Sequence, residues 1–74
     1  MNQEQLLAKT DHPRYFLATG ENKRHCQFRA RQALDACLAA GERFGAPVVE
    51  LIEITGAMAL YAELELGVAI VEID

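Results

Sequence analysis

The chain contains no serine and no tryptophan, and no lysine or arginine follows Arg43. The absence of serine excludes a serine nucleophile and leaves Cys26 and Cys37 as candidates, with His12 or His25 as bases. Both cysteines fall on apolar faces of the elements predicted below, and a thiol in apolar surroundings is inert. We interpret them as reduced core residues, with a disulfide between them as the less favoured alternative.

Recognisable metal and phosphate motifs are also absent. The two histidines and two cysteines would make up one tetrahedral set, but their spacing matches no common structural zinc pattern. The five glycines are isolated, so there is no glycine-rich phosphate loop. Glu63 and Glu65 resemble a catalytic carboxylate pair only in spacing, and a chain this short leaves little room for a cleft. The sequence therefore predicts a protein that is not an enzyme and has no metal or cofactor.

The length and composition are typical of one small folded domain. A chain of 74 residues buries about 60 to 65% of its unfolded surface, and apolar residues make up 51% of this one. No apolar run approaches a membrane span, and the first residues lack the pattern of an export signal. We expect a cytoplasmic protein with a flexible arm over residues 1–12 and a single domain over residues 13–74.

The first part of that domain has the pattern of a β-hairpin. The side chains of residues 14–19 alternate between two faces, as in a strand. The segment from Gly20 to Lys23 then supplies the glycine and asparagine of a tight turn. In the following strand Cys26, Phe28 and Ala30 share one face. The opposite face holds the polar residues His25, Gln27, Arg29 and Arg31.

A helix and a third strand are predicted next. From about Arg31 to Phe44 the apolar residues Leu34, Cys37, Leu38, Gly41 and Phe44 recur at helical spacing, and Gly45 and Pro47 provide the stop. Residues 48–54 are rich in β-branched side chains and indicate a strand. Glu50 and Glu53 lie three positions apart, so on a regular strand their side chains would point to opposite faces. We therefore expect a bulge or an edge position there.

Residues 57–66 fit two structures. Their apolar residues alternate with Tyr61, Glu63 and Glu65, which favours a strand, although alanine, leucine and glutamate favour a helix. Residues 68–73 are apolar on both faces, as in a central strand or one covered by another subunit. The predicted fold is a single α+β domain of order ββαβββ, with one alanine-rich helix on a mostly antiparallel sheet. A second helix at 57–66 is the alternative.

Charge divides the chain in two. Residues 1–44 hold seven bases and five acids, or +2, whereas residues 45–74 hold six acids and no base, or −6. A surface of one sign favours a partner of the opposite sign, here a basic protein surface. In the predicted sheet, carboxylates would follow one another at about 7 Å, similar to the phosphates of a nucleic acid. The predicted partner-binding residues are Glu50, Glu53, Tyr61, Glu63 and Glu65, and simple solubility is the competing explanation.

Two other surfaces give alternative functions. Lys23, Arg24, Arg29 and Arg31 would form a basic face for a nucleic acid, but the chain is acidic, with a pI of about 5.0, which disfavours direct nucleic-acid binding. An apolar strand containing Val68, Ile70 and Val71 would instead support a homodimeric structural or accessory protein.

The order of hairpin, alanine-rich helix over residues 33–40 and strands over residues 48–73 resembles that of several small phage-encoded anti-CRISPR proteins. The likeness covers most of the chain and is one of architecture and composition, without a diagnostic motif. It implies a non-enzymatic inhibitor that binds a CRISPR effector subunit or its nucleic-acid groove, often through acidic residues. A phage-encoded inhibitor of this kind would act in the host cytoplasm.

Overall fold

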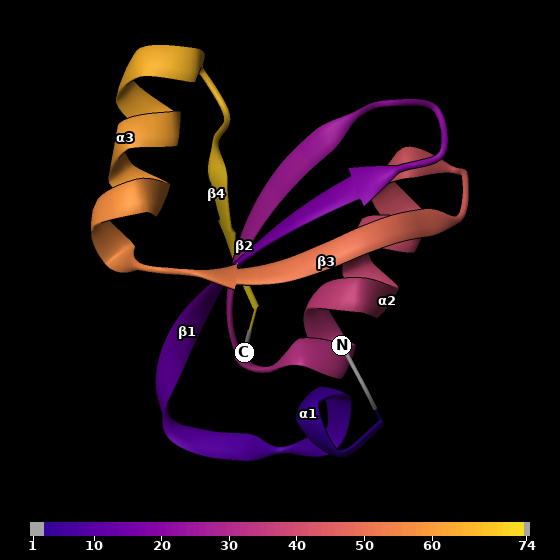
Figure 1. Ribbon diagram of the computed structural model, residues 1–74, viewed down its shortest axis with the longest axis vertical. Helices are drawn as coiled ribbons and strands as arrows, with labels where there is room; N and C mark the ends of the chain where they lie inside the picture. The colour runs from indigo at the N-terminus through magenta and orange to yellow at the C-terminus, as the bar shows by residue number, and fades with distance from the viewer. Residues whose placement is uncertain (1–2, 74) are drawn as a thin grey trace.

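A computed structural model describes residues 3–73 and contains one four-stranded sheet with a helix over each face (Figure 1). The strand order is β3-β1-β2-β4; β1 is antiparallel to both of its neighbours and β4 is parallel to β2. This arrangement confirms a small α+β fold with a mostly antiparallel sheet. The elements are α1 (Gln3–Leu7), β1 (Lys9–Gly20), β2 (His25–Gln32), α2 (Ala33–Phe44), β3 (Val48–Ile54), α3 (Gly56–Leu66) and β4 (Ile70–Glu72).

The predicted hairpin is confirmed. Phe16 of β1 lies opposite Phe28 of β2, and the reversal is closed by the Gly20 N–H donating to the Arg24 carbonyl at 2.9 Å. Lys23 takes a left-handed conformation in this turn, with φ of 66°. The alternation of β2 therefore places Phe28 against one helix and Gln27 against the other.

The segment predicted as a flexible arm is folded in its described part. Residues 3–7 form α1, residues 9–12 belong to β1, and Leu6 packs against the core. The Gln32 amide nitrogen Nε2 donates to the Leu7 carbonyl at 2.7 Å, which ties the end of α1 to the end of β2. Residues 3–12 are thus part of the domain, while residues 1 and 2 lie outside the described range.

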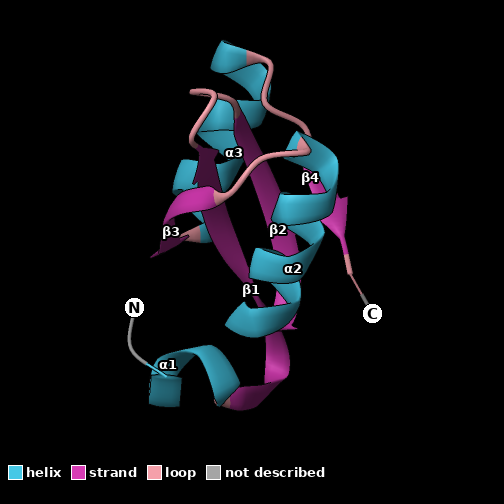
Figure 2. Cartoon of the chain, turned by 90° about the vertical axis from the view of Figure 1, so that its right-hand side faces the viewer, coloured by secondary structure: helices cyan, strands magenta, loops and turns pink. Residues whose placement is uncertain are grey.

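The core lies between the sheet and α2, which covers one face of β1 and β2 (Figure 2). The predicted helix is confirmed, but its predicted inward face is wrong in part, because Leu38 is 61% exposed and small residues point inward instead. The rings of Phe16 and Phe28 already fill the space above the sheet, so alanines allow the helix to approach closely. The buried residues of α2 are Ala33, Ala36, Ala40 and Phe44.

Gly45 ends α2 in the left-handed conformation, with φ of 60°, and donates its N–H to the Gly41 carbonyl at 3.1 Å. A side chain is strained at that φ, so Gly45→Ala is expected to lower the free energy of unfolding by about 1 kcal/mol and the melting temperature by about 4–8 °C.

The matched control is Gly41→Ala, because Gly41 is helical and an added Cβ there has open space. This variant should gain about 0.5–1 kcal/mol, since alanine favours a helix more than glycine does. Thermal denaturation followed by circular dichroism measures both changes. Shifts of the same sign in the two variants would contradict the assignment of Gly45 as the helix terminator.

Residues 57–66 are a helix, so the favoured strand prediction is wrong and the alternative holds. The Thr55 hydroxyl accepts a hydrogen bond from the Met58 N–H at 3.1 Å and caps the first turn of α3, and Gly67 ends the helix with φ of 70°. These end signals act with the helix propensity of alanine, leucine and glutamate. The alternating apolar residues are therefore spread around the whole of α3, and the buried residue of this helix, Ala59, is not one of them.

The edges of the sheet agree only partly with the predictions. β3 is an edge strand, and its register with β1 shifts between Thr19 and Gly20, which confirms the expected edge and irregularity. β4 is also an edge strand, so a central position for residues 68–73 is wrong, while cover by another subunit stays a prediction. The reason is the crossover through α3, which carries the chain from β3 across the sheet to the free side of β2. No helix of residues 3–73 is long and apolar enough to cross a membrane.

Candidate functional site

The predicted row of acidic residues does not exist as one surface. Glu50 lies opposite Thr19 and Glu53 lies opposite Phe16, so the two glutamates of β3 point to opposite faces of the sheet. Glu53 also forms an ion pair with Arg14, with 2.9 Å between Oε1 and Nη1. The two carboxylates therefore cannot form neighbouring positions of one strip.

The other three predicted contact residues lie on α3. Tyr61, Glu63 and Glu65 are all exposed, but residues two positions apart on a helix lie about 200° apart around its axis. Glu63 and Glu65 therefore leave different sides of α3, whereas Tyr61 and Glu65 share a side. On a strand the two carboxylates would lie about 7 Å apart on one face, whereas on α3 they are separate groups on different sides of the helix. Their role in partner binding stays a prediction.

The surface of α3 is mainly apolar. Tyr61, Leu64 and Leu66 are each more than 60% exposed, and Met58 and Leu60 are more than half exposed. Exposed apolar residues in such density mark interaction surfaces more often than free surface. The sequence prediction missed this surface, because in the predicted sheet the same leucines would have faced the core.

An apolar groove runs between α3 and the sheet, with a volume of about 390 Å³. Its walls come from the faces of β1 and β3 that α2 does not cover and from the facing side of α3. Gln27 is the one fully buried polar side chain of residues 3–73 and also borders the groove. The other lining residues are Leu17, Ile52, Ile54, Ala57, Met58, Tyr61, Ala62 and Leu66.

Gln27 fixes α3 and the following loop to the sheet. Its amide nitrogen Nε2 donates to the carbonyls of Ala59 at 3.1 Å and Val68 at 2.8 Å, while its Oε1 has no hydrogen-bond partner. Sequence reasoning placed Gln27 on the outer face with His25 and Arg29, where it was expected to meet solvent. Only a helix crossing that face turns it into a buried anchor.

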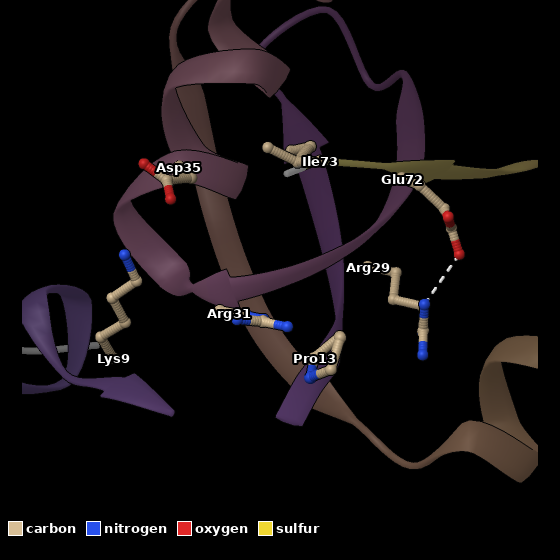
Figure 3. Close-up of a pocket in the computed structure, with 7 residues that line it drawn as sticks. All are labelled: Lys9, Pro13, Arg29, Arg31, Asp35, Glu72 and Ile73. Atoms are coloured by element: carbon tan, nitrogen blue, oxygen red, sulfur yellow. Dashed lines mark hydrogen bonds and ion pairs between the residues drawn. The ribbon is translucent and has the colours of Figure 1, made fainter. Parts of the chain in front are cut away.

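The predicted basic face is split between the two ends of β2. Arg29 and Arg31 line a hollow of about 400 Å³ together with Lys9, which the prediction had missed (Figure 3). Two carboxylates, those of Asp35 and Glu72, border the same hollow, and Arg29 Nη1 lies 2.8 Å from Glu72 Oε1. The three bases are thus largely compensated, which disfavours a strong polyanion site here.

A second hollow of about 370 Å³, the tip pocket, lies beside the hairpin turn. Arg24 from the predicted basic face lines it, but it is joined there by His25 and by Arg43 from the end of α2, while Lys23 lies in the turn outside both hollows. None of its lining residues carries a carboxylate. Its remaining walls are Cys26, Phe44, Gly67, Val68, Ala69 and Val71.

The strand predicted for dimerisation is partly covered. Val68, Ile70 and Val71 are half-buried, and Val71 packs against the core. The exposed apolar surface of this half of the chain therefore lies on α3 rather than on β4.

The two cysteines are free and half-buried, and within residues 3–73 no three histidine, cysteine or acidic side chains gather as a metal site.

Comparison of the chain with protein-family models, with curated proteins and with solved structures found no match.

Proposed function

We propose that this chain is a non-enzymatic binding protein that docks through α3 onto an apolar surface of another protein, and that basic residues surround that surface. The observation that carries the proposal is the exposure of Tyr61, Leu64 and Leu66 on α3. A helix with apolar residues on all of its sides is ordinarily enclosed by protein, and α3 departs from this pattern only at Glu63 and Glu65. Here the chain itself covers only the side that contains Ala59, so a partner surface accounts for the rest.

Charge supports a basic partner over a second copy of this chain. α3 carries Glu63 and Glu65 and no lysine or arginine, and residues 45–74 hold a charge of −6. A twofold interface through α3 would bring these carboxylates near one another, and like charges at an interface are unfavourable. A partner with lysines and arginines around an apolar groove would pair with them instead.

An inhibitor of the anti-CRISPR kind is the most specific form of this proposal. A nucleic-acid groove of an effector subunit offers the basic residues that the acidic half of the chain would pair with. The contact would combine apolar packing of α3 with charge pairing, in place of a continuous strip that imitates phosphates. Homodimerisation through Val68, Ile70 and Val71 is the rival function. Because these three residues are partly buried, they offer less apolar surface for an interface than α3 does.

Leu64→Glu is expected to abolish capture of the partner, because it places a charge in the apolar contact. The assay is a pull-down with the tagged chain from nuclease-treated host lysate, with bound proteins identified by mass spectrometry. Leu38→Glu is the matched control, since Leu38 is 61% exposed on α2, on the other face of the sheet. A basic protein should be retained at stoichiometric amounts by the original chain and by the control, and lost with Leu64→Glu.

Salt provides a second arm of the same experiment. Raising the ionic strength to about 1 M shortens the screening length to about 3 Å and should weaken the charge pairing several-fold. Equal capture by the Leu64 and Leu38 variants would contradict docking through α3. Recovery of the bait alone, with a dimer mass in sedimentation, would favour the homodimer.

A further inference from the structure

We propose that the tip pocket binds a small amphipathic carboxylate, meaning a molecule with one carboxylate and an apolar chain or ring. The pocket is built from the start of β2, the end of α2 and the loop between α3 and β4. The groove beside α3 is formed by other residues, so this site is independent of the proposed docking surface.

The charged side chains of the pocket are all basic. The ion pairs of residues 3–73 are Arg14 with Glu53 and Arg29 with Glu72, so the guanidinium groups of Arg24 and Arg43 belong to neither. In a chain with a net charge of −4, this hollow is lined by two such arginines and by no carboxylate. A guanidinium group offers paired N–H donors that match the two oxygens of a carboxylate.

Part of the pocket wall is apolar, which favours a ligand with an apolar part over a bare inorganic anion. Phe44 is 8% exposed, and Val68 and Val71 are half-buried beside it. The volume of about 370 Å³ lies at the lower end of the range of small-molecule sites, about 300–1,000 Å³. An inorganic ion would leave these walls without contacts, and an uncharged apolar molecule would leave the arginines without a partner.

Hydrogen bonds hold the walls in place without a ligand. The loop after α3 is fixed by the Val68 N–H donating to the Ala62 carbonyl at 3.1 Å and by Gln27 Nε2 donating to the Val68 carbonyl at 2.8 Å. Asn22 of the hairpin turn donates through Nδ2 to the Phe44 carbonyl at 3.3 Å, which joins the turn to the end of α2. A site formed in advance loses less entropy when a ligand binds.

The test is a titration with sodium octanoate followed by backbone amide chemical shifts. Sodium acetate supplies the charge without the tail, and 1-octanol supplies the tail without the charge. We expect saturable octanoate shifts at residues 26, 44 and 68–71, and much weaker effects from either control compound. The shifts also separate this pocket from the α3 groove, which would respond at residues 54, 58 and 61.

The double variant Arg24→Gln/Arg43→Gln is expected to weaken octanoate binding at least tenfold, because two charged donors are lost. Arg31→Gln is the matched control, since Arg31 is a base of β2 that lines the other hollow, and this variant should bind octanoate as the original chain does. The proposal is overturned if octanoate gives no saturable shifts, if the shifts fall in the α3 groove, if acetate matches octanoate, or if the double variant binds unchanged. Because this assay needs no protein partner, its outcome is separate from that of the pull-down.

Discussion

Phe28→Ala is expected to lower the free energy of unfolding by about 3–5 kcal/mol, because it empties the centre of the core. Phe28 is fully buried, lies opposite Phe16 on β1, and faces the alanines of α2. Alanine side chains are too short to fill the space that a missing ring would leave. A domain of this length has a total stability of roughly 4–11 kcal/mol, so the variant should be close to unfolding.

Urea denaturation followed by circular dichroism measures this loss. Leu38→Ala is the matched control, because it removes a large apolar side chain from the exposed side of α2 and should change stability by less than about 0.5 kcal/mol. A loss below about 1 kcal/mol for Phe28→Ala would show that the ring does not lie beneath α2.

The elements that the sequence predicted correctly are those in which local signals agree. In β2 the strict alternation from His25 to Arg31 matches β propensity, and in α2 the alanines, Gly45 and Pro47 all indicate the same helix and the same end. Residues 57–66 failed because alternation and propensity disagreed. The decisive signals were Thr55 and Gly67, which cap the two ends of the helix. Such capping residues predict the structure better than the alternating apolar pattern does when the apolar residues need not all be buried.

The candidate sites were less predictable, because each depends on residues that are distant in the chain. Arg43 joins Arg24 in the tip pocket only through the packing of α2 on the sheet, and Lys9 joins Arg31 only through the length of β1. Leu38 was expected to point inward because it recurs at helical spacing with Leu34 and Cys37. The facing phenylalanine rings are so large that small alanines, rather than Leu38, fit between α2 and the sheet, and this cannot be seen from the sequence of one element alone.

Gln27→Glu is the second substitution for which we expect a large effect, a loss of about 3–5 kcal/mol at neutral pH. Nε2 of Gln27 donates to two carbonyls, those of Ala59 and Val68, within a fully buried position. An ionised carboxylate has no proton to donate, so both carbonyls would face a negative charge that water does not reach. The link from β2 to α3 and to the loop of the tip pocket would be lost.

The same substitution makes stability depend on pH in a defined direction. Burial and the two carbonyls would raise the pKa of the introduced carboxyl in the folded state above its unfolded value of about 4.3. The folded state then holds the proton more tightly, so the extra loss is small below pH 4 and grows by up to about 1.4 kcal/mol per pH unit above it, until the folded pKa is passed. Gln27→Met is the matched control, because it also breaks both hydrogen bonds but carries no charge, and its loss of about 1–3 kcal/mol relative to the original chain should not change with pH. Urea denaturation of the three proteins between pH 4 and pH 8 measures the difference, and a Gln27→Glu loss that stays constant over this range would show that the side chain is in contact with water rather than buried beneath α3.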